Sequence, residues 1–224
     1  MDNPHIDIYF YGKNATEVTG SCILIETSSR KILLECGLYQ STNPVSDFMI
    51  NSEPLPFNPA EIDYVFCNHT HVDHIGRLPV LYKNRCSAPL IMPKGSAYVL
   101  SSLLYDCSKI TRFDAKKISR KNHKKLQPYY NDENVDRTIR RLEEYDFNVL
   151  HRLDDCISFM FVPAGHILNS AQLVLFIQDG DLKKKILYTS DLGNTFVKKY
   201  YVQPFEKVDS ADIVIGESTY GDTY

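Results

Sequence analysis

The segment 69–74, with the sequence HTHVDH, places three imidazoles and one carboxylate within six residues. On an extended chain, residues two apart point the same way, so His69 and His71 can hold one cation. Asp73 and His74 would then face a neighbouring position. Imidazole and carboxylate together suit a borderline divalent ion such as Zn²⁺. The segment therefore predicts a metal site, and a histidine-rich surface loop is the alternative.

Two later residues can complete this site, because each has a metal-binding side chain at the end of a strand-like run. His166 follows the run 157–165, whose last residue is a glycine that lets the backbone come close. Asp191 ends the run 184–191. Alone, His166 would be an ordinary polar residue and Asp191 a turn aspartate. With the first segment they predict two sites: His69, His71 and His166 for one ion, Asp73 and His74 for the other, and Asp191 between them.

The elements that must position these residues follow from the apolar pattern, which predicts an α/β chain in which hairpins dominate the sheets. Apolar residues at helical spacing predict a helix over 95–110, and Asn131 and Asp132 can cap a second over 135–145. The region 42–60 contains four prolines and is expected to be a loop. An Asp-Gly step predicts a hairpin turn over 178–181. Strands are predicted over 6–12, 21–28, 31–37, 64–69, 89–93, 157–165, 170–178, 184–191 and 211–219.

Composition excludes several classes of protein. The 224 residues include 25 Lys and Arg against 28 Asp and Glu, and 43% are hydrophobic. These values exclude a disordered chain, a collagen-like fibre and a disulfide miniprotein. No apolar run approaches the roughly 20 residues that span a bilayer, and the N-terminus lacks the pattern of a signal peptide. We expect a soluble, cytoplasmic protein without a membrane partner, whose six cysteines are mostly buried, reduced thiols.

The order HxHxDH, then Gly-His, then Asp resembles the metallo-β-lactamase superfamily, from the first predicted strand to the last residue. The resemblance implies an αββα sandwich, complete or incomplete at its C-terminal side, with two divalent metals at one edge. Members of this superfamily hydrolyse β-lactams, thioesters, phosphodiesters and alkylsulfates. Zinc is the expected metal.

Two further segments, AGHILNSA (164–171) and ESTYGD (217–222), resemble the β-CASP branch, whose members are nucleases that process RNA and DNA. In that branch the glutamate partners a histidine that helps to protonate the leaving group, so the resemblance gives Glu217 this role. A plain acidic residue at a strand end is the alternative. Two metals activate water and stabilise phosphate charge, and Asp73 is the candidate base. Single-stranded RNA is the expected substrate.

The sequence departs from the family pattern at a few positions. Glu35 stands where the family usually has an aspartate that orients the metal ligands. Asn169 and Ser190 replace glycines near the metals. The family's two later histidines have no counterpart here. The resemblance thus implies one of three cases. Residues 1–224 are the N-terminal portion of a metallo-β-lactamase domain that a β-CASP domain follows, or the chain works with a partner protein that supplies the missing histidines, or it is not a competent nuclease.

A basic stretch falls between residues 112 and 125. Positive charge near a two-metal site suits a phosphodiester substrate, because each neutralised phosphate releases counterions. A solvated helix face is the alternative. The residues predicted to contact nucleic acid are Lys116, Lys117, Arg120, Lys121, Lys124 and Lys125.

Two other functions remain open at this point. A different metal hydrolase of the superfamily, such as a thioesterase of the glyoxalase type, would need a narrow cleft without a basic approach. A non-catalytic subunit that keeps the fold could help to assemble an RNA-processing complex. Six available metal ligands argue against that last function, and the absent second half of the family pattern argues for it.

Overall fold

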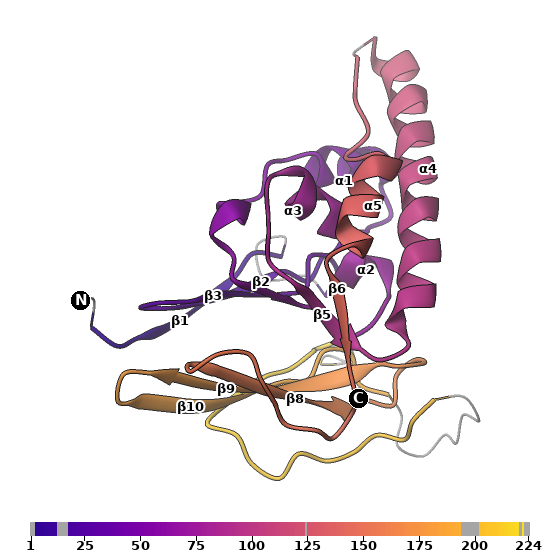
Figure 1. The fold of residues 1–224 in the computed structure, drawn as a ribbon. Helices are drawn as coiled ribbons and strands as arrows, with labels where there is room; N and C mark the ends of the chain where they lie inside the picture. The colour runs from indigo at the N-terminus through magenta and orange to yellow at the C-terminus, as the bar shows by residue number, and fades with distance from the viewer. Residues whose placement is uncertain (1–2, 13–17, 124, 194–201, 220, 222–224) are drawn as a thin grey trace.

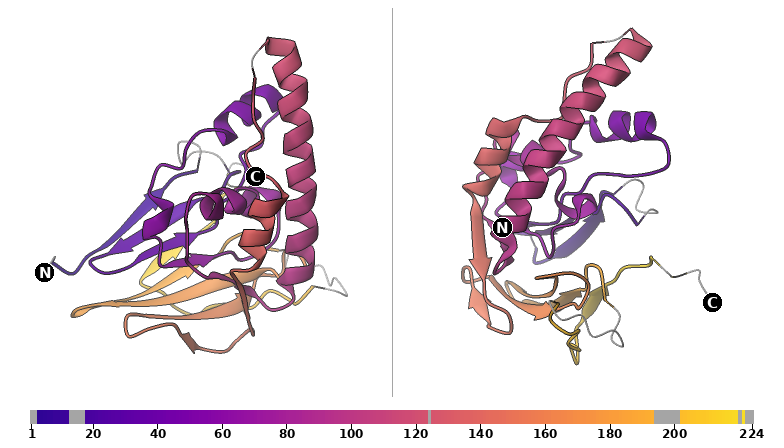
Figure 2. Two further views of the ribbon diagram at one scale, coloured as in Figure 1. Left: turned by 45° about the horizontal axis from the view of Figure 1, so that its top comes forward. Right: turned by 90° about the vertical axis from the view of Figure 1, so that its right-hand side faces the viewer.

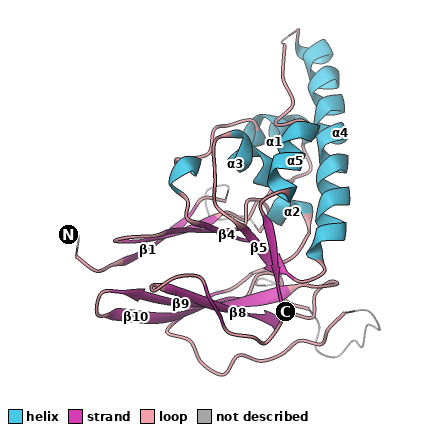
Figure 3. Cartoon of the chain, in the orientation of Figure 1, coloured by secondary structure: helices cyan, strands magenta, loops and turns pink. Residues whose placement is uncertain are grey.

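Two β-sheets face each other, and the helices gather on the outer side of the first sheet (Figure 1). This arrangement comes from a computed structural model that describes residues 3–12, 18–123, 125–193, 202–219 and 221. The two sheets are seen edge-on as separate layers in Figure 3, with the helices above them. The expected α/β architecture with two sheets is therefore confirmed.

The first sheet has six strands in chain order. They are β1 (Ile6–Phe10), β2 (Ile23–Thr27), β3 (Lys31–Leu34), β4 (Tyr64–Phe66), β5 (Leu90–Pro93) and β6 (Leu142–Tyr145). The first three pair antiparallel, and β3 to β6 pair parallel. Parallel neighbours require crossover connections, and the helices lie in these connections. Consequently the carboxyl ends of β3 and β4 lie at one edge of the sheet.

The crossover segments contain α1 (Pro44–Asn51), a 3₁₀ turn (η2, Pro59–Glu61), α2 (Val72–Ile75), α3 (Leu78–Lys83), α4 (Ser96–Asn122) and α5 (Asp132–Ile139). The longest of them, α4, runs past the other helices and projects from the body of the molecule (Figure 2). Within the described ranges, no helix is both long and apolar enough to cross a membrane.

The second sheet has the order β11 (Ile213–Ile215), β10 (Leu182–Tyr188), β9 (Ala171–Asp179), β8 (Ile157–Pro163) and β7 (His151–Arg152). Its neighbours pair antiparallel except for β10 and β11, which are parallel. Leu182 pairs with Asp179 across the β9–β10 hairpin, and Gly180 in the turn has φ of 58°. The predicted Asp-Gly hairpin is confirmed.

An apolar core fills the space between the two sheets. Phe66 of the first sheet packs edge-to-face against Phe159 of the second, with ring centroids 5.0 Å apart. Ile25 and Ile32 are fully buried on the same inner face of the first sheet, and Leu175 meets them from the second. Burial of these side chains fixes which face of each strand points inward, and thereby the register in which neighbouring strands pair.

Three sequence predictions about elements differ from the structure. The region 42–60 is not all loop, because Asn43 accepts the Ser46 N–H at the start of α1 and buried Phe48 anchors that helix. The helix predicted over 95–110 continues to Asn122. The helix predicted over 135–145 starts at the expected cap but ends at Ile139, and the following residues form β6.

The helical layer lies on only one side of the sandwich in the described part of the chain (Figure 3). On the outer face of the second sheet, Val162, Val174 and Leu187 are buried, and partly buried Val208 and Ala211 pack against them. An extended segment rather than a helix therefore covers this apolar patch.

Candidate metal centre

Strand ends bring the predicted ligands together. Residues 69–71 follow β4, and His71 is the N-cap of the short helix α2, which carries Asp73 and His74. His166 follows β8 of the second sheet, and Asp191 follows β10. The three donors of the first predicted group and the bridging Asp191 thus come from both sheets.

Two glycines permit the close backbone approach that this arrangement needs. A Cβ on Gly37 would lie 1.5 Å from the Asp73 carbonyl oxygen, and one on Gly193 would lie 1.7 Å from the Gly165 carbonyl oxygen. The first contact sets the end of β3 against the loop with Asp73 and His74. The second sets the loop after Asp191 against the loop that carries His166.

The first predicted group is compact. Ligand atoms of His69, His71, His166 and Asp191 all lie within 4.8 Å of one another. His166 Nε2 lies 3.2 Å from His71 Nδ1, and the His69 and His71 ring centroids are 4.9 Å apart. Three imidazoles and a carboxylate at this spacing are a donor set that can hold one divalent ion.

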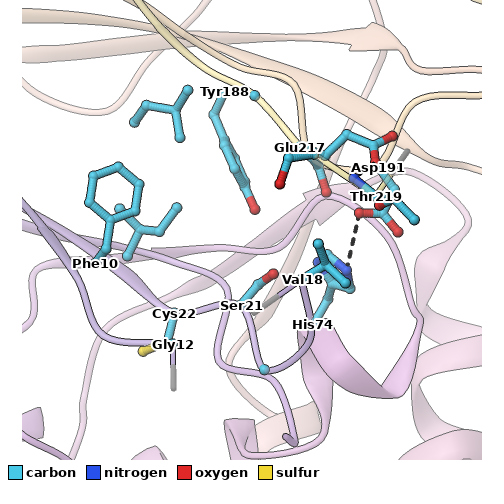
Figure 4. Close-up of a pocket in the computed structure, with 16 residues that line it drawn as sticks. Phe10, Gly12, Val18, Ser21, Cys22, His74, Tyr188, Asp191, Glu217 and Thr219 are labelled. Carbon is cyan, nitrogen blue, oxygen red and sulfur yellow. Dashed lines mark hydrogen bonds and ion pairs between the residues drawn. The ribbon is translucent and has the colours of Figure 1, made fainter. Parts of the chain in front are cut away.

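Asp191 faces both predicted groups, each with a different oxygen. Its Oδ2 lies 3.6 Å from His69 Nε2 and 3.4 Å from His166 Nε2. Its Oδ1 lies 3.3 Å from His74 Nε2, and Asp73 Oδ2 is 3.5 Å from that same nitrogen. Figure 4 shows His74 and Asp191 facing each other, with Glu217 close by. This geometry fits the predicted position of Asp191 between two ions.

Two buried nitrogens show that the residues present suit a metal. His69 and His74 are almost wholly buried, and among the described residues their Nε2 atoms have no hydrogen-bond partner. A buried polar atom without a partner is costly and needs an explanation. Because both atoms point toward Asp191, a divalent cation at each position would satisfy them. Imidazole with carboxylate is a donor set typical of zinc.

Glu35 orients two of these histidines from the side of their Nδ1 atoms, His74 directly and His69 through Ser190. It is fully buried, and it accepts hydrogen bonds from His74 Nδ1 and from the Tyr188 hydroxyl at 2.5 Å. The Ser190 hydroxyl donates to the other carboxylate oxygen at 2.8 Å and lies 3.2 Å from His69 Nδ1. The contacts place Glu35 where an orienting carboxylate is needed, in spite of its extra methylene.

Electrostatics keep the buried carboxylates ionised. Burial alone would raise the pKa of Glu35, but the charge and hydrogen bond of His74 outweigh it, so the pKa lies below its ordinary value. Burial also opposes ionisation of Asp191, and contacts with His69 and His74 nevertheless hold its pKa well below the usual range. Conversely, burial would lower the pKa of His74, but Glu35 and Asp191 raise it well above 6.5.

In the two more accessible histidines, His71 and His166, the lowered pKa favours the neutral form. Burial and the nearby His69 lower the pKa of both His71 and His166. A neutral imidazole keeps the lone pair that a metal needs. The pKa of Asp73 is also lowered, because contacts with His74 outweigh the effect of burial.

All three departures from the family pattern that lie near the site have left-handed backbone. The φ angles are 61° at Glu35, 58° at Asn169 and 50° at Ser190. Glycine adopts this conformation without strain, and asparagine tolerates it better than most residues. The backbone therefore explains why a glycine suits positions 169 and 190.

Glu217 lies beside the site but is occupied with backbone contacts. It follows β11, is exposed, and accepts the Leu192 N–H at 2.9 Å and the Thr219 N–H at 3.2 Å. It thus ties the segment after Asp191 to the end of β11. Its predicted part in proton transfer stays a prediction.

Residues 112–122 of the basic stretch lie in the projecting half of α4, and they are not brought into the metal centre. Arg112 in this half pairs with Asp132 at 2.9 Å. Lys124 lies outside the described residues. The other predicted nucleic-acid contacts are exposed, and no described ion pair involves them: Lys116, Lys117, Arg120, Lys121 and Lys125.

The sequence does not identify two residues that contribute to the site. In the sequence, Tyr188 is only part of a predicted strand, and Ser190 is only a replacement for glycine. Both contact Glu35 across the gap between the sheets. No short-range signal marks such contacts, because Glu35 lies more than 150 positions away along the chain.

The chain is therefore an α/β protein of two facing sheets, whose strand ends bring together histidines and aspartates that can hold a divalent metal. The sequence model of the metallo-beta-lactamase superfamily matches residues 15–154, more than half of the chain, and the chain belongs to that superfamily. The solved structure of BJP-1, a subclass B3 metallo-beta-lactamase of Bradyrhizobium japonicum, has the same fold. It matches with a TM-score of 0.54 and 18% identity, over 97% of this chain and 79% of that one.

Two curated relatives have names that state an activity. A ribonuclease of Thermus thermophilus is 30% identical over 93% of this chain, and a probable RNase of Methanocaldococcus jannaschii is 35% identical over 97%. The matches cover 42% and 46% of these relatives. The chain therefore spans less than half the length of the relatives it resembles.

Proposed function

We propose that this chain is the metal-binding part of a β-CASP-type nuclease that hydrolyses phosphodiester bonds in single-stranded RNA with two zinc ions. The observation that carries the proposal is the convergence of His69, His71, His166 and Asp191 from three strand ends. The names of the two relatives support RNA as the substrate.

In this proposal the chain supplies two sets of ligands. His69, His71 and His166 hold one ion, Asp73 and His74 hold the other, and Asp191 faces both. When bound, two such ions act as Lewis acids on the phosphate and activate water. The protein contributes fixed ligand positions, because Glu35 and the close backbone contacts hold the histidines in place.

Asp73 is the proposed base. Its carbonyl oxygen accepts the Ser21 N–H at 2.9 Å, which fixes the backbone of the residue. Its lowered pKa keeps the carboxylate ionised at neutral pH, so it can accept a proton from the attacking water.

We further propose that a second domain or a partner protein supplies the proton for the leaving oxygen. The histidines that are not ligands lie elsewhere: His5 contacts Asn3, His123 is the C-cap of α4, and His151 packs edge-to-face against Tyr145. None of these three is placed to protonate a group at the metal centre.

A reducing location, such as the cytoplasm, is also proposed. All six cysteines are free thiols and five are buried. Free thiols persist where disulfides are kept reduced.

The test is the metal content of the chain together with cleavage of a 5′-labelled single-stranded RNA. We expect two zinc ions per chain, and loss of zinc and of cleavage in His71→Ala. His5→Ala removes a histidine away from the site and should change neither. A chain that binds no zinc, or equal cleavage by His71→Ala, would contradict the proposal. Zinc binding without cleavage would place the chemistry with the missing partner.

A further inference from the structure

Ser190 lies between the buried carboxylate and one of the two buried histidines that can bind metal. Its hydroxyl oxygen is 2.8 Å from Glu35 Oε1 and 3.2 Å from His69 Nδ1. The residue is 2% exposed, so water does not compete for these contacts. It follows β10 of the second sheet, whereas Glu35 follows β3 of the first.

The direction of each hydrogen bond follows from counting protons. An ionised carboxylate only accepts, so the single hydroxyl proton of Ser190 must point at Glu35. Toward His69 the same oxygen can then only accept, and His69 Nδ1 must carry a proton. A metal-binding imidazole that carries its proton on Nδ1 offers the lone pair of Nε2, which in His69 is the atom that faces Asp191.

His74 is oriented by the same carboxylate without an intermediary. Its Nδ1 donates directly to Glu35 Oε2, which again leaves Nε2 toward Asp191. The two histidines serve the two different metal positions. The two oxygens of Glu35 therefore act on a ligand of each metal position. One contacts His74 directly, and the other reaches His69 through the Ser190 hydroxyl.

We propose that Ser190 is a positioning residue of the metal centre, whose hydroxyl transmits the orienting effect of Glu35 to His69. One buried carboxylate thereby sets the ring tautomer of a ligand at each metal position. This inference rests on the metal centre of the proposed function but not on RNA as the substrate.

The backbone at Ser190 separates this role from a merely structural one. Its φ of 50° is left-handed, a conformation that glycine adopts without strain. Ser190→Gly should therefore fold at least as well as the unchanged chain while it lacks the hydroxyl. If Ser190 only shaped the backbone, this variant would bind metal normally.

The matched control is Thr189→Val. The Thr189 hydroxyl belongs to the adjacent residue and donates to the Ser190 carbonyl oxygen at 2.8 Å, away from the ligands. Zinc affinity is measured by competition with a chromophoric chelator. We expect Ser190→Gly to weaken zinc binding about 10- to 100-fold, as removal of an orienting group typically does, and Thr189→Val to leave it unchanged.

A second measurement uses ¹⁵N-histidine NMR on the chain freed of metal with a chelator. We expect His69 to be protonated at Nδ1 in the unchanged chain and to lose this fixed tautomer in Ser190→Gly. Unaltered zinc affinity in Ser190→Gly, equal weakening in Thr189→Val, or a proton on Nε2 of His69 would each overturn the inference. If the chain passes these tests but His71→Ala cleaves RNA as well as the unchanged chain does, the proposed function alone would be contradicted, because cleavage would then not need the metal centre.

Discussion

At the scale of single residues, the metal centre depends on the lack of a side chain at Gly37 as much as on the side chains of its ligands. Gly37 has no side chain where the Asp73 carbonyl passes, and the Cys36 N–H donates to the His74 carbonyl at 3.0 Å. The two ligands of α2 are thus held by the backbone of the segment after β3. A side chain at position 37 would push these ligands away.

We predict that Gly37→Ala disrupts the metal centre. Its new methyl group would overlap the Asp73 carbonyl, and overpacking of this kind costs about 1–3 kcal/mol or more. Zinc affinity should fall and the midpoint of urea unfolding should decrease. The control is Gly216→Ala, where the nearest atom to a new Cβ is 3.9 Å away. If the two variants had the same zinc affinity and the same unfolding midpoint, the close contact between Gly37 and the Asp73 carbonyl would be contradicted.

At the scale of elements, β3 is clamped to the second sheet at both ends. At its carboxyl end, Glu35 receives hydrogen bonds from Tyr188 and Ser190. Before its first residue, Arg30 donates to Asp154 at 2.6 Å, and Asp154 also accepts the N–H groups at the start of β8. Each end therefore has one carboxylate that joins the two layers.

The Asp154 contacts predict a pH-dependent stability. Burial raises the pKa of Asp154, but Arg30 and the backbone N–H groups outweigh it, so the folded pKa lies below the ordinary value. A lowered pKa contributes stability that is present above about pH 4 and is lost as pH falls through the folded pKa.

We expect Asp154→Asn to lower the free energy of unfolding by about 1–3 kcal/mol at pH 7, with a difference that shrinks below about pH 4. Urea unfolding between pH 7 and pH 3 measures both. Asp155→Asn is the control, because the side chain of Asp155 is 97% exposed. A difference that stays constant down to pH 3 would show that the charge of Asp154 is not responsible.

Secondary-structure elements could be predicted where the local sequence pattern was strong. They could not be predicted where contacts with distant parts of the chain determined the structure. Apolar runs identified most strands, and the Asn131 cap identified the start of α5. The segment 142–145 reads locally like the continuation of a helix, but it pairs in parallel with β5. In the region 42–60, the four prolines favoured the prediction of a loop. A helix nevertheless begins there at Pro44, because the first turn of a helix accepts proline.

The metal ligands were predictable for a related reason. Segment 69–74 contains four of the predicted ligands, and His166 and Asp191 lie at the ends of two strand-like runs. The contacts behind them were not predictable, because Tyr188 and Ser190 reach Glu35 only through the packing of two sheets.

At the scale of the whole molecule, the metal centre and the basic end of α4 lie apart. Val72 and Asp106 line one groove, and Arg120 lies fourteen residues beyond Asp106, about 21 Å along the helix. Asp47 and Asp114 also line this groove, which makes it acidic. An RNA that reaches both places would therefore contact the exposed face of α4 rather than the groove.

Charge reversal on α4 tests this path. We predict that the triple change Lys116→Glu, Lys117→Glu and Lys121→Glu weakens binding of single-stranded RNA. It should also reduce the slope of log affinity against log salt by about 2, since each lost phosphate contact removes about 0.7. Binding titrations at several salt concentrations measure the slope.

The control changes the same number of charges on the second sheet and the segment beside it, through Lys183→Glu, Lys184→Glu and Lys207→Glu. It should leave the slope nearly unchanged, because β10 and the segment beside Val208 belong to the second sheet, whereas α4 lies on the outer side of the first (Figure 1). Equal slopes for the two triple variants would assign α4 no special part in RNA binding.

The central claim is that the strand ends build two adjacent sites for divalent ions. Anomalous diffraction at the zinc edge from crystals grown with zinc tests it most directly. We predict two peaks per chain, one among His69, His71 and His166 and one beside Asp73 and His74, with Asp191 next to both. A single peak, or peaks only at surface residues, would contradict the claim.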